Sequence, residues 1–352
     1  MRRIACGLIA AVLLLTILPG NAIVNKERIF LQETISYLKP EEIPMTPDGI
    51  HHYLLISMDK WQNNPENPGY NDGMVILTLD EVSGRVIVTS LIRDMLVIRP
   101  DGTPGRINRI IRQYGIQELL DTINSHLGLE INKYVLMDWR HIMEIVDAAG
   151  GVDINLTSTE VNYLKGWSVP IGSTKPVLQS AGDYHLNGFA TVIYMRIRKR
   201  RASNDIDTQD FGRTFRVRTV LSSLARGLRD ADFSQAQGLL SAIIKVWDQP
   251  FDKSFTYEGI RNNGIFTWGD PPKDPNRRRY ATNISMLDML EAARIAFALR
   301  SYDVEQWRLP ADGTVEPYTY ASGAGQLVDF AKNRELFHAF LFPDNFIVAE
   351  EP

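Results

Sequence analysis

Two neighbouring apolar runs constrain the fold of this chain more than any other feature. Residues 74–79 and 85–92 are almost continuously apolar and rich in β-branched side chains, and the five residues from Asp80 to Gly84 join them. A connection of this length is typical of a β-hairpin, and continuous apolar character predicts strands that are buried on both faces. We therefore expect a buried hairpin inside a layered sheet.

The rest of the chain alternates between strand and helix patterns. Short apolar runs predict further strands at 53–58 and 152–156. Apolar residues at helical spacing, with capping residues such as Ser285 and Asp288, predict helices at 116–127, 140–149, 187–200, 211–228, 285–298 and 326–341. This alternation is typical of an α/β fold, in which helices cover the faces of a sheet.

The first 22 residues have the order of an export signal. Arg2 and Arg3 precede an uncharged stretch at 4–18, and Pro19 to Ala22 follow it. Fifteen uncharged residues are fewer than the about 20 of a membrane span, which favours a cleaved signal peptide but leaves an uncleaved anchor open. Both alternatives are extracytoplasmic: a secreted protein, or one anchored at the outer face of the cell membrane. We expect a connecting segment at 23–50 and one domain at 51–350, with a loop-rich insertion at 251–281.

Charge and cysteine content exclude some classes of function. The chain has 38 Lys and Arg residues against 42 Asp and Glu residues, a net charge of -4, whereas nucleic-acid-binding domains normally carry a basic excess. We therefore expect no nucleic-acid partner, and any anion site must be local. Cys6, the only cysteine, lies in the leader, so the domain has no disulfide and no cysteine metal ligand.

The predicted hairpin places charged residues at one end of the sheet. Asp72 precedes its first strand, and Arg93 and Asp94 follow its second, so antiparallel pairing brings all three to the same rim. If the strand at 53–58 ends there too, Asp59 joins them. Carboxylates at such a rim are hard oxygen ligands that suit Mg²⁺, which keeps several waters and bridges to phosphate. The alternative is that Asp59 and Asp72 only cap loops, where aspartate is common.

A second group of charges is basic. Residues 194–201 and 210–218 contain a high density of arginine in an otherwise acidic protein, which indicates an anionic partner such as phosphate. The alternative is a solvated basic surface. Arg196 and Arg198 are two positions apart and share one helical face only if the helix ends there, so we expect them at a helix C-terminus that points into a site.

These charged residues belong to an ordered series of short motifs. The series lies at 54–59, 71–73, 91–94, 106–108, 146–153, 186–188 with 194–198, and 210–213, and a weaker part continues at 282–285 and 308–310. In its order and residue types, the series resembles the motifs of the LytR-CpsA-Psr family, from about residue 50 to 230. The resemblance implies a three-layer α/β/α fold with a central mixed sheet and an apolar tunnel for a lipid tail.

The resemblance also implies a role for each charged residue of the motifs. Asp59 and Asp72 match the magnesium ligands of the family, which implies Mg²⁺ as cofactor. The residues that match its pyrophosphate ligands are Arg93, Arg196, Arg198 and Arg213, with Arg106 where the family often has lysine. Asp94 and Asp210 match acidic residues that orient the arginines or assist proton transfer, so the implied catalytic set is Arg93, Asp94, Asp210 and Arg213.

The function that follows from the resemblance is an extracytoplasmic, Mg²⁺-dependent phosphotransferase. Such an enzyme moves a glycopolymer phosphate from a polyprenyl-pyrophosphate carrier to peptidoglycan at the membrane surface, with pyrophosphate cleavage as a second activity. Two departures from the family pattern, Tyr70 before the metal motif and Val217 in place of glutamine, leave an alternative open. In that alternative the protein binds polyprenyl-pyrophosphate lipids in wall assembly or regulation without catalysis.

Overall fold

The structure is a computed structural model that describes residues 26–58, 71–137, 139–167, 178–198, 209–231, 237–239, 241, 243, 282–320 and 323–343. The predicted leader at 1–22, Asp59 with Tyr70, and the predicted insertion at 251–281 lie outside these residues.

A five-stranded mixed sheet lies at the centre of the domain. Its strands, in the order β6-β1-β2-β3-β9, are Lys133–Met137, Ile50–Met58, Asn71–Asp80, Arg85–Leu91 and Val304–Leu309. The predicted hairpin is confirmed, because β2 and β3 pair antiparallel from Met74 with Leu91 to Asp80 with Arg85. β1 joins β2 antiparallel, whereas β6 and β9 pair with their neighbours in parallel. Ile76 and Ile87 are completely buried, as strands covered on both faces require.

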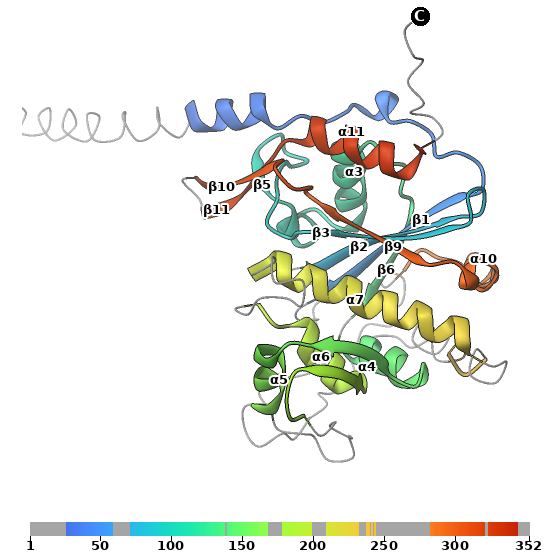
Figure 1. The fold of residues 1–352 in the computed structure, drawn as a ribbon. Helices are drawn as coiled ribbons and strands as arrows, with labels where there is room; N and C mark the ends of the chain where they lie inside the picture. Colours follow the sequence, from blue (N-terminus) through green and yellow to red (C-terminus); the bar gives the residue numbers. More distant parts are fainter. Residues whose placement is uncertain are drawn as a thin grey trace, which may run out of the picture.

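Helices cover both faces of this sheet (Figure 1). α3 (Ile116–Leu127) and α11 (Phe330–Leu341) lie on one face, and the long α7 (Gln209–Asp230) crosses the other. Beyond α7 lie α4 (Trp139–Ala148), α5 (Ser158–Lys165) and α6 (Gly188–Met195), together with the ribbon of β7 (Val152–Leu156) and β8 (Gly182–Leu186). The predicted α/β fold with a central mixed sheet between helical layers is therefore confirmed.

Shorter elements complete the described part of the chain. β4 (Leu96–Ile98) and β5 (Pro104–Arg106) form a small ribbon that leads into η2 (Ile107–Arg109) and α2 (Ile110–Gln113). α10 (Met286–Ala298) begins at the predicted capping box, where the Ser285 hydroxyl accepts from the Asp288 amide, and η4 (Leu299–Ser301) follows it. η1 (Pro40–Glu42) precedes β1. No helix among the described residues has both the length and the apolar character of a membrane span.

Two predicted helices have different bounds in the structure. The helix predicted at 187–200 ends at Met195, with Arg196 as its C-cap. The helix predicted at 326–341 begins only at Phe330, because residues 323–328 form β11 (Gly323–Val328), which pairs antiparallel with β10 (Val315–Tyr320). The Asp329 side chain caps α11 by accepting from the Lys332 amide, so the local start signal lies after the strand.

Part of the segment predicted as a connection packs on the domain. Residues 26–34 are helical, and Leu31 and Ile35 are only 2% and 1% exposed in the core that contains α3 and α11. Burial of two such side chains contributes about 1.5–3 kcal/mol each. This segment therefore has a fixed position on the helical layer.

Candidate functional site

The rim of the hairpin brings together the charges that the sequence placed there. Asp72 lies at the start of β2, and the Arg93 guanidinium from beyond β3 donates to its carboxylate. Asp94 follows Arg93, and its main-chain carbonyl accepts a hydrogen bond of 2.9 Å from the main-chain N–H of Gln326 in β11. The predicted gathering of Asp72, Arg93 and Asp94 at one rim is confirmed, because the register of β2 and β3 leaves these residues at the same end of the ladder.

The first turn of α7 adds an acid and a base to this rim. Arg213 lies 3.5 Å from the Asp72 carboxylate and also donates to the Asp72 carbonyl. Asp210, one turn earlier, lies 3.6 Å from both Arg93 and Arg213 and 3.1 Å from Arg198. Asp72, Arg93, Arg198, Asp210 and Arg213 thus form one connected network, which we call the Arg-Asp cluster. Its three guanidiniums and two carboxylates leave one positive charge in excess.

The burial of this cluster determines its electrostatics. Burial lowers the pKa of Arg213, whose side chain is 9% exposed, and the charges of Asp72 and Asp210 oppose that shift. Burial also acts to lower the pKa of Arg93, but Asp72 and Asp210 outweigh it and the net shift is upward. Because arginine keeps its proton in proteins, both groups stay cationic at neutral pH. The cluster is therefore a partly desolvated cationic site, where an anion is held more strongly than at an exposed surface.

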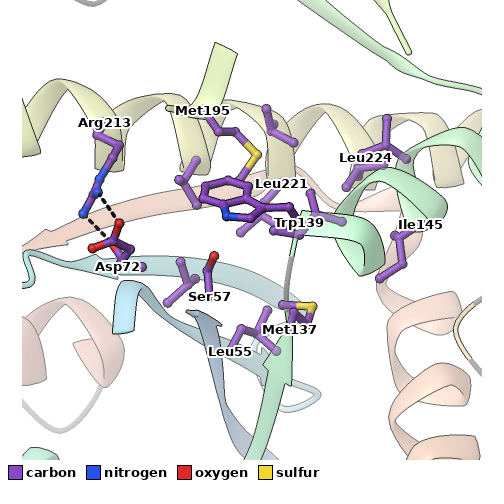
Figure 2. Close-up of a pocket in the computed structure, with 16 residues that line it drawn as sticks. Leu55, Ser57, Asp72, Met137, Trp139, Ile145, Met195, Arg213, Leu221 and Leu224 are labelled. Carbon is purple, nitrogen blue, oxygen red and sulfur yellow. Dashed lines mark hydrogen bonds and ion pairs between the residues drawn. The ribbon is translucent and has the colours of Figure 1, made fainter. Parts of the chain in front are cut away.

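An apolar pocket of about 750 Å³, counting its open mouth, begins at this cluster. Figure 2 shows Asp72 and Arg213 joined at one end of it and Trp139, Met195, Leu221 and Leu224 further in. The remaining lining residues come from the sheet and from α4 and α7: Leu55, Ser57, Gly73, Val75, Met137, Ile142, Ile145, Val146, Val217 and Val220. An ionic group at one end of a hydrocarbon-lined pocket suits an amphiphile with an anionic head and an apolar tail.

A second, polar pocket of about 650 Å³ borders the cluster. Three residues of the cluster line this polar pocket: Arg93, Arg198 and Asp210. No described residue lines both pockets. Its other lining residues are Asp94, Arg106, Asn108, Pro317, Tyr318, Thr319, Ala324, Gly325 and Gln326. The Arg-Asp cluster therefore separates an apolar pocket from a polar one.

Arg106 and Arg196 lie beside the two pockets that border the cluster. Arg106 lines the polar pocket. Arg196 lies with its guanidinium carbon 4.4 Å from the ring centroid of Trp139, beside the apolar pocket. The predicted helix end at Arg196 and Arg198 is confirmed, and Arg198 lies 3.1 Å from the Asp210 carboxylate. The roles of both arginines as pyrophosphate ligands stay predictions.

Two adjacent residues at the rim have oxygen atoms that could coordinate a cation. Asp72 offers a carboxylate, and the adjacent Asn71 is fully buried with neither polar atom of its amide bonded. Met58, which precedes Asp59 in the sequence, pairs with Asn71. The described part of the chain holds no group of three or more His, Cys, Asp or Glu side chains that could hold a metal ion. Oxygen donors of this type and small number fit Mg²⁺, which protein sites often hold by one or two carboxylates plus phosphate and water.

The sequence predictions gave no role in the site to three of its residues. Asn108, Tyr318 and Gln326 line the polar pocket, and the last of these was assigned to a helix. The aromatic and β-branched residues at 315–320 are a strand signal that could have indicated β10, because they follow the turn-forming pair Asp312-Gly313. No local pattern indicates that this hairpin reaches Asp94.

Comparison with known sequences decides the family. The sequence profile of the LytR-CpsA-Psr family matches residues 32–249, more than half of the chain. The chain belongs to the LytR-CpsA-Psr family. β9, β10, β11 and α11 lie beyond the matched region.

Sequence relatives agree with this assignment, and a solved structure agrees with the fold. The chain is 27% identical over 159 residues to the polyisoprenyl-teichoic acid–peptidoglycan teichoic acid transferase TagV of Bacillus subtilis, covering 44% of this chain and 38% of TagV. It is 26% identical over 222 residues to the corresponding transferase TagU of Bacillus mycoides, covering 60% of this chain and 65% of TagU. These matches span less than two thirds of either relative. The structure of the family protein YwtF (TagT) with bound octaprenyl pyrophosphate lipid superposes with a TM-score of 0.55 at 15% identity, over 86% of this chain and 95% of that one.

Proposed function

We propose that this protein transfers a glycopolymer phosphate from a polyprenyl-pyrophosphate carrier to peptidoglycan at the outer face of the cell membrane. The observation that carries the proposal is the Arg-Asp cluster at one end of an apolar pocket. A lipid pyrophosphate has the complementary form, a diphosphate attached to a hydrocarbon chain. The transferases TagV and TagU and the lipid-bound TagT structure support this choice of donor.

The apolar pocket supplies binding energy for the lipid. Trp139, Leu221 and Leu224 offer apolar surface on the side away from Asp72 and Arg213 (Figure 2). Each methylene group that moves from water into such surroundings contributes about 0.8 kcal/mol. Prenyl units nearest the diphosphate would lie in the pocket, and the rest of the chain could stay in the membrane.

The arginines would hold the diphosphate and stabilise its charge as transfer proceeds. Arg93, Arg198 and Arg213 are already held close together by Asp72 and Asp210, so little reorganisation is needed when the substrate binds. Arg106 and Arg196 would bind from the two sides of the cluster. Phosphoryl transfer depends mainly on positioning and electrostatic stabilisation, which a site without a protein nucleophile can supply.

Asp72 and Asp59 would hold Mg²⁺ together with phosphate oxygens. The ion would neutralise charge on the diphosphate. Asp94 is suited to accept the proton of the attacking hydroxyl, because its Oδ1 is buried without a hydrogen-bond partner at the cluster. A water molecule in place of the sugar hydroxyl would give the second proposed activity, pyrophosphate cleavage.

The proposed location follows from the N-terminal sequence. Arg2 and Arg3 before an uncharged stretch at 4–18 support export, followed by signal cleavage or anchoring in the membrane. A lipid-linked donor also requires the domain to work at the membrane surface. Detection of the intact N-terminus in membrane fractions would support the anchor, and a mature chain that begins after residue 22 would support cleavage.

The substitution Arg93→Ala tests the proposed transfer. With a synthetic polyprenyl-pyrophosphate disaccharide, Mg²⁺ and soluble peptidoglycan fragments, we expect transfer to fall about 10²–10³-fold, as for loss of one preorganised donor. Arg294→Ala is the matched control, because Arg294 is an exposed arginine of α10 that pairs with Glu81 and Glu291. Unchanged transfer in the Arg93 variant would refute the mechanism.

A second candidate function is non-catalytic binding of the same lipids. Val217, where the family usually has glutamine, lines the apolar pocket and adds no polar group beside the cluster. The wild-type protein distinguishes the two functions in one assay. Retention of the labelled lipid without release of lipid monophosphate supports binding alone, whereas release that depends on Arg93 supports the transferase.

A further inference from the structure

The polar pocket contains unbonded groups that a ligand could satisfy. Among the described residues, Oδ1 of Asp94, Nε of Arg106 and Oδ1 of Asn108 are buried atoms without a hydrogen-bond partner, and all three residues line this pocket. A buried polar atom without a partner costs about 1–3 kcal/mol. Three such atoms around one cavity indicate a ligand that carries both hydrogen-bond donors and acceptors.

The hairpin of β10 and β11 forms the outer wall of this pocket. Gly325 packs so closely on the segment after β3 that an added Cβ would lie 2.6 Å from Leu96 and 2.9 Å from the Asp94 carbonyl. Tyr318, Thr319 and Gln326 are among the residues of this wall. Aromatic, hydroxyl and amide groups together suit a sugar, which has apolar ring faces and many hydroxyl groups.

The direction of phosphoryl transfer decides which sugar the pocket can hold. The attacking and leaving oxygens lie roughly in line across the phosphorus. The lipid phosphate must leave toward the apolar pocket, because the lipid occupies that side of the Arg-Asp cluster. The attacking hydroxyl therefore approaches from the other side of the cluster, where the polar pocket and Asp94 lie.

We propose that the polar pocket between Asp94 and the β10–β11 hairpin is the binding site for the acceptor glycan. The proposal rests on the transferase function. A hydroxyl oxygen of the acceptor bonds to the phosphorus that carries the glycopolymer, and the bond from this phosphorus to the bridging oxygen breaks. The lipid monophosphate leaves with that electron pair, Asp94 takes the hydroxyl proton and later releases it to water, and a phosphodiester results.

Burial and the charge of Asp210 raise the pKa of Asp94, which makes its carboxylate a better proton acceptor than an exposed one. A hydrogen bond from the Gln326 side chain opposes this rise in pKa, and the main-chain N–H of Gln326 donates to the Asp94 carbonyl. The same hairpin thus contributes to the pocket wall and fixes the position of Asp94. Because β10 and β11 lie outside the matched family region, this wall is a place where acceptor choice can differ between family members.

Tyr318→Ala and Thr319→Val test the acceptor site. The assay measures transfer from a synthetic polyprenyl-pyrophosphate disaccharide to a soluble peptidoglycan tetrasaccharide, with each substrate varied in turn. We expect the acceptor KM to rise about tenfold, on the scale of one lost sugar hydrogen bond or ring contact, with donor affinity unchanged. Glu316→Gln, an exposed change on β10 that does not line the pocket, is the matched control and should match the wild type.

Other outcomes overturn the proposal in distinguishable ways. If the wild type transfers and folded variants keep the wild-type acceptor KM, the glycan binds elsewhere and only the acceptor site fails. If donor affinity falls as much as acceptor affinity, the pocket holds the donor sugar. If the wild type turns over no donor, both the transferase function and this site fail. Thr319→Val is nearly isosteric and exposed, so it tests the site even if the Tyr318 variant, which loses the stacking on Phe30, does not fold.

Discussion

A buried ion pair behind the site allows a quantitative prediction. Arg216 and Glu160 are both 0% exposed, and Nε of Arg216 donates to Glu160 at 2.7 Å. Arg216 also donates to the Ile197 carbonyl at 2.9 Å, immediately before Arg198 of the cluster. The other Glu160 oxygen accepts from the amide and hydroxyl of Thr157 at 2.9 Å and so caps α5. One pair therefore joins α5, α7 and the segment that carries Arg198.

The substitution Arg216→Met leaves the Glu160 carboxylate buried without its partner. Loss of one member of a buried pair costs about 3–5 kcal/mol, a large share of a typical stability of about 5–15 kcal/mol. Addition of Glu160→Gln removes the uncompensated charge and keeps a side chain that can cap α5. We expect the double variant to recover at least about 2 kcal/mol relative to Arg216→Met, because the penalty arises from the unpaired charge.

Urea unfolding of the wild type, both single variants and the double variant measures this coupling. Arg226→Met, at an exposed arginine of the same helix, should change the free energy of unfolding by less than about 0.5 kcal/mol. Affinity for the lipid pyrophosphate should also fall in folded Arg216→Met, since the Ile197 carbonyl loses its donor. The assignment of this pair as the support of Arg198 would be refuted by either of two results. One is a decrease in the free energy of unfolding of less than about 1 kcal/mol in Arg216→Met, and the other is strict additivity of the two single substitutions in the double variant.

Three further predictions concern the lipid pocket and two titrating groups. Leu221→Asp places a charge in the apolar pocket, so affinity for the lipid donor should fall about tenfold or more while affinity for inorganic pyrophosphate stays unchanged, as titrations of both ligands would show. The pKa of Asp94 is raised above its ordinary value of 3.8, so the transfer rate should decline as pH falls through this raised pKa. In a pH-rate profile, the Asp94→Asn variant should retain little activity, and that activity should not show this decline. Burial lowers the pKa of His126 from 6.5 to about 4, and the charge of Arg334 acts in the same direction, whereas the hydrogen bond from its Nδ1 to the Thr122 carbonyl opposes the shift. The unfolded chain therefore binds a proton that the folded protein does not, and stability present above pH 6.5 should be lost as pH falls toward 4. The loss should be up to about 3 kcal/mol, and urea midpoints of His126→Gln should lack it.

The sequence by itself determined the parts of the site that depend on local periodicity. Continuous apolar runs at 74–79 and 85–92 specified the hairpin, and antiparallel pairing then placed Asp72, Arg93 and Asp94 at one rim. The capping pair Ser285 and Asp288 specified the start of α10 for the same reason, because both partners of the contact lie within one turn of helix.

Tertiary structure decided which of the many arginines meet. Arg213 and Arg216 lie one turn apart on α7, yet one lines the apolar pocket and the other is paired with Glu160 in the interior. Arg196 and Arg198 likewise diverge, one over Trp139 and one toward Asp210. Spacing along a helix gives only the relative direction of side chains. The packing of α7 between the sheet and the helices α5 and α6 decides which residues each side chain contacts.

The outer wall of the polar pocket depended on tertiary structure most of all. Gln326 was assigned to a helix because apolar residues after it fit helical spacing, and it lies more than two hundred residues from Asp94 in sequence. β11 instead pairs with β10 and reaches the Asp94 carbonyl through a main-chain hydrogen bond. Contacts of this range arise only when separate layers bury their apolar faces together, and no local pattern in the chain encodes that choice.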